Sequence, residues 1–171
     1  MKSPIFLIGY MAAGKSTIGK LLASQLNVDF IDIDKLIEQK ENVSVDYIFE
    51  EHGEKYFRDA EADFVLNHDF KNAVVSTGGG LPCFNDNMAK LVIQGETVYL
   101  NATADTISER LLKTDLKTRP LLKGVALDQL NKNITEKLAE RSFYYEQAKH
   151  IIDTNGKTVN EIVEEIVASL T

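Results

Sequence analysis

Residues 9–17, Gly9-Tyr-Met-Ala-Ala-Gly-Lys-Ser-Thr17, lie between a short apolar run, Pro4 to Ile8, and a helical pattern over Ile18 to Leu26. They match the P-loop pattern G-x-x-x-x-G-K-[ST], in which glycines allow backbone N–H groups to curl around phosphate oxygens. In such a loop Lys15 reaches the β- and γ-phosphates, Ser16 offers its hydroxyl to Mg²⁺, and the following helix presents its positive end to the anion. The sequence therefore predicts a nucleoside triphosphate site rather than an ordinary Gly-rich turn.

Apolar runs alternate with helical patterns along the whole chain, which predicts an α/β fold with a parallel sheet. Strands are expected at 5–8, 30–33, 73–75, 97–100 and 151–152, and further helices at 35–40, 86–93, 104–113 and 127–148. The expected N-caps are Asp34, Asn85 and Thr103, and Thr158 to Glu161 form a capping box before the last helix. Ligands of open α/β sheets bind beyond the carboxyl ends of the strands, so candidate site residues are sought there.

Length and composition indicate a single domain over residues 1–171 that works in the cytoplasm. The net charge of −7 argues against a general nucleic-acid binder. Cys83 is the only cysteine, so no intramolecular disulfide is possible, and a half-buried thiol is the expected state. The first strand begins soon after Met1, which leaves no room for a signal peptide, and no apolar run is long enough to span a membrane. A monomer is expected.

Two acidic residues mark the end of the second predicted strand, Phe30-Ile-Asp32-Ile-Asp34. A period of two would place both carboxylates on one side of the chain at the carboxyl edge of the sheet. Asp32 would then hold Mg²⁺ directly or through water, together with Ser16, while Asp34 accepts a hydrogen bond or a proton from a substrate hydroxyl. The alternative is that Asp34 only caps the next helix and Asp32 is a solvated strand end.

The third predicted strand ends in Thr77-Gly78-Gly79-Gly80, where P-loop proteins often carry an acidic metal ligand. No acid is present here, which shifts metal binding toward Ser16 and Asp32. Three consecutive glycines carry an entropic cost that makes sense where the backbone approaches a ligand closely. A flexible turn is the alternative.

Arginine is rare in this chain, since only four of its 19 basic residues are arginines: Arg58, Arg110, Arg119 and Arg141. A planar guanidinium is suited to bidentate recognition of carboxylate or phosphate, so each is a candidate ligand contact. Arg58 has Glu61 three residues later, which could orient it. The alternatives are a surface helix ion pair for Arg58, an ordinary exposed connection for the loop of Arg119, and a helix surface charge for Arg141.

These motifs occur together in the order and approximate spacing of shikimate kinase, which the chain resembles from end to end. The resemblance rests on the P-loop, Asp32-Ile-Asp34, Gly53-Glu with Phe57-Arg58 and Glu61, Thr77 to Gly80, Arg119-Pro120-Leu-Leu, and Glu140-Arg141 with Tyr144 and Tyr145. It implies a three-layer P-loop fold of the nucleoside monophosphate kinase type, with a five-stranded parallel sheet and a mobile lid over about 112–124. It also implies Mg²⁺-dependent transfer of the ATP γ-phosphoryl group to the 3-hydroxyl of shikimate, on the route to aromatic amino acids.

The resemblance also implies an acceptor region over about 34–61 and a role for each site residue. Asp34 holds substrate hydroxyls and is the candidate to take the proton. Arg58 and Arg141 clamp the shikimate carboxylate, while Gly79 and Gly80 contact substrate or γ-phosphate. Tyr144 and Tyr145 are expected to be packing residues.

For the nucleotide, the resemblance implies that Lys15 and Arg119 neutralise charge that develops during transfer. Arg110 resembles the adenine-stacking arginine of the family, and Asn155 lies in the segment expected at the other face of the base. The predicted nucleotide contacts are Ala12, Ala13, Gly14, Lys15, Ser16, Thr17, Arg110, Arg119 and Asn155.

Two other functions fit part of this pattern. A related small-metabolite kinase, such as a gluconate kinase, would share the P-loop but carry different acceptor residues. A non-catalytic nucleotide-binding module would keep the fold and lose turnover, yet Lys15, Asp34, Arg58 and Arg119 are all present.

Overall fold

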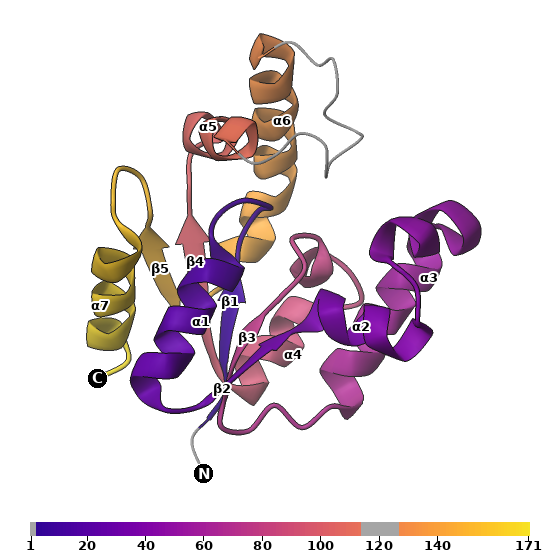
Figure 1. Cartoon of the computed structure of the whole chain (residues 1–171), viewed down its shortest axis with the longest axis horizontal. Coiled ribbons are helices and arrows are strands. Elements are labelled where there is room, and N and C mark those ends of the chain that lie inside the picture. Colours follow the sequence, from indigo (N-terminus) through magenta and orange to yellow (C-terminus); the bar gives the residue numbers. More distant parts are fainter. Residues whose placement is uncertain (1–2, 114–126) are drawn as a thin grey trace.

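A five-stranded parallel sheet forms the centre of the molecule, with the strand order β2-β3-β1-β4-β5 (Figure 1). The structure is a computed structural model and describes residues 3–113 and 127–171. The strands are β1 (Ile5–Ile8), β2 (Asp29–Asp32), β3 (Ala73–Ser76), β4 (Glu96–Asn101) and β5 (His150–Asp153). This arrangement confirms the predicted α/β class and the five-stranded parallel sheet.

Helices connect the strands and cover both faces of the sheet. They are α1 (Lys15–Leu26), α2 (Ile33–Glu41), α3 (Val45–Asn67), the short 3₁₀ helix η1 (Leu81–Cys83), α4 (Asn87–Gln94), α5 (Ala104–Lys113), α6 (Leu127–Tyr145) and α7 (Val159–Ser169). Figure 1 shows α1 and α7 on one face and α2, α3 and α4 on the other, while α5 and α6 rise beyond the carboxyl ends of the strands. The three-layer arrangement therefore leaves that edge of the sheet to form the site.

The central strand β1 divides its side chains between two hydrophobic cores. Ile5 and Leu7 pack with α1 and α7, whereas Phe6 and Ile8 pack with the helices on the opposite face. Consecutive side chains of a strand point to opposite faces, so an entirely apolar strand is what a sheet covered on both sides requires. A third, smaller cluster joins α5 and α6 to Tyr10 of the P-loop.

Several predicted boundaries and caps were wrong by a few residues. Asp32, not Asp34, is the N-cap of α2, and its side chain accepts from the backbone N–H of Lys35. The helix therefore begins at Ile33, two residues before the predicted start at Lys35. At α4 the N-cap is Asp86 rather than Asn85, and no side-chain capping bond forms there. The helix predicted over 127–148 is α6, which ends at Tyr145 rather than at residue 148.

The capping prediction at α7 is confirmed, because Thr158 and Glu161 form both bonds of a capping box. The predicted lid spans about 112–124, and only Leu112 and Lys113 are described, both at the end of α5. The rest of the predicted lid, including Arg119, lies outside the described residues.

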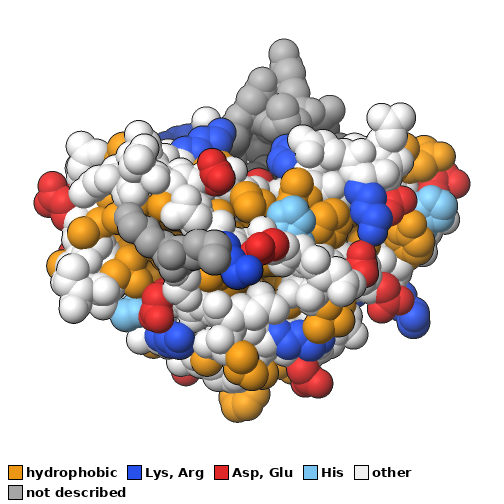
Figure 2. Space-filling view, turned by 90° about the horizontal axis from the view of Figure 1, so that it is seen from below, with side chains coloured by type: hydrophobic (Ala, Val, Ile, Leu, Met, Phe, Trp, Pro, Cys, Tyr) orange, Lys and Arg blue, Asp and Glu red, His pale blue; other side chains and the backbone are white. Residues whose placement is uncertain are grey.

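None of the helices formed by the described residues has the length and apolar composition needed to cross a membrane. Figure 2 shows the face below the sheet in the orientation of Figure 1, where acidic and basic side chains are interspersed with hydrophobic ones. Neither sign of charge dominates this face.

Candidate active site

The P-loop connects β1 to α1 at the carboxyl edge of the sheet. Lys15 is 8% exposed, and its Nζ donates to the carbonyl oxygens of Gly9 at 2.7 Å and Tyr10 at 2.9 Å. These two bonds hold the ammonium over the loop itself. The Lys15 ammonium group, which is predicted to bind the phosphates, therefore already lies at the P-loop.

A cavity of about 320 Å³ opens beside the P-loop and reaches the second Gly-rich turn. Three segments far apart in the sequence line it: the P-loop, the end of β2 with the start of α2, and the residues after β3. The lining residues are Met11, Ala12, Gly14, Lys15, Ser16, Thr17, Asp32, Asp34, Ser76, Thr77, Gly78 and Gly79. The structure therefore brings most of the predicted nucleotide and metal residues to one cavity.

Ser16 and Asp32 meet at the phosphate side of this cavity. The Ser16 hydroxyl donates to Oδ2 of Asp32 at 3.1 Å. Hydroxyl and carboxylate oxygens suit a hard divalent cation that keeps several waters and binds phosphate oxygens as well. The described residues contain no group of three or more His, Cys, Asp or Glu side chains arranged to hold a metal. A cation at this position would thus depend on few protein ligands.

Asp34 lies deeper, in the first turn of α2, and not on the strand as the period of two suggested. Its Oδ1 is buried and has no hydrogen-bond partner among the described residues. Burial and the nearby charge of Asp32 raise the pKa of Asp34, while Lys15 and Arg58 oppose the shift. A carboxylate with a raised pKa and an open acceptor oxygen is suited to bind a hydroxyl group and to take up its proton.

Gly78 is the point of closest approach between the turn and the carboxylates. A Cβ on this residue would lie 2.7 Å from Oδ1 of Asp34 and 2.6 Å from Oε1 of Glu61. Since any side chain would displace one of these buried oxygens, a glycine is required here for steric reasons. The two carboxylates therefore face the same peptide from α2 and α3.

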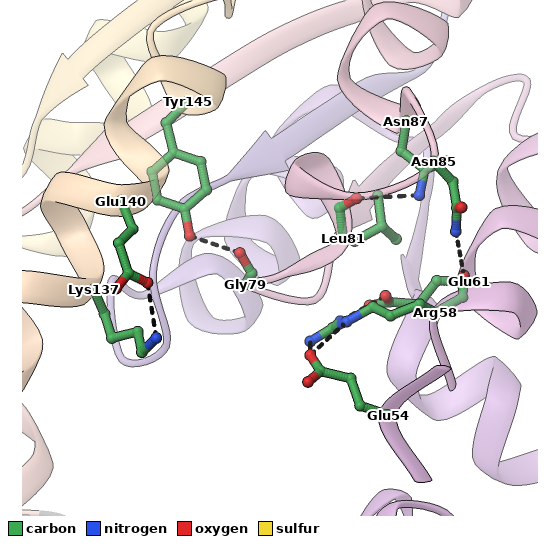
Figure 3. A network of polar contacts seen from close by, with 10 residues as sticks. All are labelled: Glu54, Arg58, Glu61, Gly79, Leu81, Asn85, Asn87, Lys137, Glu140 and Tyr145. Carbon is green, nitrogen blue, oxygen red and sulfur yellow. Dashed lines mark hydrogen bonds and ion pairs between the residues drawn. The ribbon is translucent and has the colours of Figure 1, made fainter. Parts of the chain in front are cut away.

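Arg58 of α3 is held by two glutamates, as Figure 3 shows. Its Nη1 donates to Glu61 at 2.6 Å, and its Nε and Nη2 donate to Glu54 at 3.1 and 3.0 Å. The guanidinium also lies 4.6 Å from the ring centre of Phe84 and directly against Gly80. The contact of Glu61 with Arg58 agrees with the expectation that Glu61 orients this arginine. The contact of Glu54 with Arg58 was not predicted, although Glu54 lies four residues before Arg58, a spacing that favours ion pairs on a helix.

Glu61 is fully buried, and its Oε1 has no partner among the described residues. Burial raises the pKa of Glu61 to about 7, against the lowering effect of the Arg58 charge and hydrogen bond. This glutamate thus changes charge near neutral pH while it holds a site arginine.

Arg141 of α6 approaches the Gly-rich turn at Gly79, the residue before the one that Arg58 contacts. A Cβ on Gly79 would lie 3.5 Å from Nη1 of Arg141, and the guanidinium lies 5.3 Å from the ring centre of Tyr10. The neighbouring Tyr145 is fully buried, packs on Tyr99 as expected, and donates its hydroxyl proton to the carbonyl of Gly79 (Figure 3). This polar contact was not predicted.

The predicted adenine residues lie together at the outer side of the P-loop. Nη1 of Arg110 donates to the carbonyl of Ala13 at 2.9 Å, and Nη2 donates to that of Thr154 at 3.1 Å. Asn155 accepts hydrogen bonds from the backbone of Thr103 and the hydroxyl of Thr106 at the start of α5. Arg110 and Asn155 thus fix neighbouring segments, but they are not part of the cavity lining.

A P-loop that faces a second Gly-rich turn, with a buried carboxylate and two arginines around that turn, defines a phosphotransferase of the P-loop kinase class. A family model described as shikimate kinase matches residues 11–171. The chain belongs to the shikimate kinase family. It is therefore an ATP-dependent kinase that acts on an alcohol group.

Individual relatives agree with this assignment. A shikimate kinase from Azobacteroides pseudotrichonymphae is 39% identical over 168 residues, which cover 97% of this chain and 98% of the relative. The crystal structure of shikimate kinase from Bacteroides thetaiotaomicron superimposes with a TM-score of 0.88 at 38% identity and 98% coverage of both chains. The enzyme from Acinetobacter baumannii in complex with shikimate gives a TM-score of 0.85 at 31% identity, covering 99% of this chain and 93% of that one.

A gluconokinase from Sinorhizobium meliloti has a TM-score of 0.56 at 17% identity, covering 98% of this chain and 91% of that one. At that identity the likeness shows a shared fold only. The gluconate kinase alternative therefore has support at the level of architecture and not at the level of family.

Proposed function

We propose that this chain transfers the γ-phosphoryl group of ATP to the 3-hydroxyl of shikimate and releases ADP and shikimate 3-phosphate. The observation that supports this proposal most directly is that Arg58 and Arg141 both lie against the Gly79-Gly80 turn. The buried Asp34 lies next to this turn, and the cavity beside the P-loop reaches it. This arrangement suits a small polyhydroxylated carboxylate. Two fixed guanidinium groups hold the carboxylate, and the open oxygen of Asp34 accepts from a hydroxyl group.

In the proposed step, the 3-hydroxyl oxygen attacks the γ-phosphorus in line with the bond to the β,γ-bridging oxygen. A new O–P bond forms, the bond to the bridging oxygen breaks, and ADP leaves with that electron pair. Asp34 accepts the hydroxyl proton. Because the transition state of phosphoryl transfer is loose, positioning and charge stabilisation carry most of the catalysis.

We propose that Mg²⁺ is the divalent cation and that Ser16 and Asp32 hold it, since their oxygens already meet at 3.1 Å. When bound, the metal neutralises charge on the phosphate oxygens. Lys15 exchanges its bonds to Gly9 and Tyr10 for phosphate oxygens, and we assign the complementary role at the γ-phosphate to Arg119. Arg110 and Asn155 are the proposed adenine side of the site.

Release of ADP by the purified protein tests this proposal, measured with Mg²⁺-ATP alone and with shikimate, gluconate or a nucleoside monophosphate added. We expect strong stimulation by shikimate and none by the other two acceptors. Stimulation by gluconate instead would favour the related sugar-acid kinase. A slow rate that no acceptor changes would favour the non-catalytic nucleotide-binding module.

A further inference from the structure

Tyr145 belongs to the hydrophobic core that contains Phe6 and Ile8 of β1. The residue is fully buried, and its ring lies 5.2 Å from that of Tyr99 on β4. Its hydroxyl nevertheless donates to the carbonyl oxygen of Gly79 at 2.6 Å, which joins α6 to the turn after β3 (Figure 3). A buried polar group at the end of an aromatic ring usually has a specific partner, and here that partner belongs to the acceptor site.

The direction of hydrogen bonding is fixed by chemistry. Burial raises the pKa of Tyr145, so the hydroxyl keeps its proton at neutral pH and donates a hydrogen bond to the carbonyl oxygen of Gly79. Nη1 of Arg141 lies 3.5 Å from the position that a Cβ on Gly79 would take, and the charge of Arg141 acts on the Tyr145 hydroxyl. Tyr145 and Arg141 thus both approach the Gly79 peptide.

The Tyr145 hydrogen bond constrains two predicted substrate contacts, Gly79 and Gly80, at once. The C=O of Gly79 and the N–H of Gly80 belong to one planar trans peptide, so the Tyr145 bond to the carbonyl also sets the direction of the amide. Three glycines in succession would otherwise leave this turn many conformations. Arg141 lies against the same turn at Gly79, with its guanidinium 5.3 Å from the ring centre of Tyr10.

We propose that Tyr145 is a positioning residue for the acceptor carboxylate, because it fixes the Gly79-Gly80 peptide against which Arg58 and Arg141 lie. It does not touch the reacting atoms. The inference rests on the proposed function, since it concerns binding of the acceptor. The residue combines packing with a hydrogen-bonded link that an aliphatic or phenyl side chain cannot supply.

Replacement of Tyr145 by Phe keeps the ring and removes only the hydroxyl. We expect the KM for shikimate to rise about tenfold, the size of effect expected when a buried carbonyl loses its donor. The KM for ATP and kcat should change less than about twofold, because the P-loop and Asp34 are untouched. Tyr144→Phe is the matched control, since it removes a hydroxyl one residue away on a half-buried ring, and it should leave all three constants unchanged.

A double-mutant cycle tests the link to Arg141. If Tyr145 positions the turn against which Arg141 lies, Tyr145→Phe should cost much less in shikimate KM when Arg141 is already replaced by Lys. Equal costs in both backgrounds, or an equal rise in the two KM values of Tyr145→Phe, would overturn the proposed role. Tyr145→Met, which also fills the space without a hydroxyl, provides the same test if the Phe variant does not fold.

The outcome for the unaltered chain separates this inference from the proposed function. If the unaltered protein shows no stimulation by shikimate, the proposed function is wrong. If it is stimulated and Tyr145→Phe keeps the same shikimate KM, only the role of Tyr145 is wrong.

Discussion

Arg58 uses three nitrogens to bind two glutamates, so its guanidinium plane is fixed before any substrate arrives. A lysine at this position would place a point charge where a planar fork is needed. We expect Arg58→Lys to raise the KM for shikimate by about 10- to 100-fold and that for ATP by less than about twofold.

Arg110→Lys provides the reciprocal control for Arg58→Lys. Arg110 contacts the P-loop carbonyls and lies away from the Gly-rich turn, so its replacement should affect the KM for ATP more than that for shikimate. Steady-state kinetics with each substrate varied in turn measure both effects. Equal losses for both substrates in Arg58→Lys would contradict a specific role in acceptor binding.

Lys15 carries the only ammonium group among the residues that line the cavity. Lys15→Ala should lower kcat by about a thousandfold or more, because charge on the transferred group would lose its nearest cation. Circular dichroism should show an intact fold. Lys20→Ala, an exposed change on the same helix, should retain full activity. Substantial turnover by Lys15→Ala would disprove the role assigned to this residue.

The raised pKa of Glu61 should make the free energy of unfolding decrease as the pH rises. Its pKa is raised from 4.5 to about 7 in the folded protein, so the folded state binds the extra proton between these values. The stabilising contribution is complete below about pH 4.5 and is lost as the pH rises through 7. In Glu61→Gln this loss is absent, so wild type should lose about 2 to 3 kcal/mol relative to the variant between pH 5 and 8.

Urea unfolding at several pH values measures the effect of Glu61. Glu164→Gln, at an exposed position of α7, should keep the pH dependence of the unaltered protein. A difference between wild type and Glu61→Gln that stays constant with pH would show that the buried carboxyl has an ordinary pKa.

Among the secondary-structure elements, α3 contains a kink at Gly53, where φ is +80° and ψ is 168°. This conformation is almost restricted to glycine. The kink separates the first half of α3 from the segment that carries Glu54, Arg58 and Glu61, so it determines how that segment meets the Gly-rich turn.

Gly53→Ala should therefore lower the free energy of unfolding by about 1 to 3 kcal/mol and raise the KM for shikimate. Gly156→Ala is a suitable comparison, because Gly156 also has a positive φ and open space around it but is remote from α3. It should reduce stability without a change in shikimate KM. Thermal unfolding and kinetics together test this, and an unchanged shikimate KM in Gly53→Ala would show that the kink does not position Arg58.

Local sequence patterns predicted the elements well where short-range rules control them. Apolar runs identified all five strands, and the capping box identified the start of α7. The turn from β2 into α2 was misplaced because Asp32 and Asp34 are both good caps, and only the three-dimensional packing of Ile33 decides between them.

The site was predictable where a motif carries its own geometry, as the P-loop does. The close approach of Glu61 and Asp34 to Gly78 was not, because it depends on how three separate connections after the strands pack together. The hydroxyl bond of Tyr145 was missed for the same reason, since its partner is 66 residues away in sequence.

At the scale of the whole molecule, β1 supplies alternate side chains to both hydrophobic cores, so neither layer of helices can separate without exposing this strand. We expect the amide protons of β1 to exchange only through global unfolding, with the full free energy of unfolding. Amides of the edge strand β5, where Ile151 is 52% exposed, should exchange through smaller openings.

Native-state hydrogen exchange at increasing denaturant concentration measures these free energies strand by strand. The value for β1 should equal that from equilibrium unfolding. Exchange of β1 through an opening of lower free energy would show that the two cores unfold independently.

The C-terminal end of the chain lies on the side of the sheet opposite the cavity. Residue 171 follows α7 near the amino edge of the strands (Figure 1). A tag, a fused protein or a solid support attached at this end would therefore face away from the P-loop and the Gly-rich turn. The molecule is thus suited to oriented immobilisation on a sensor surface, with its substrate cavity open to the solution.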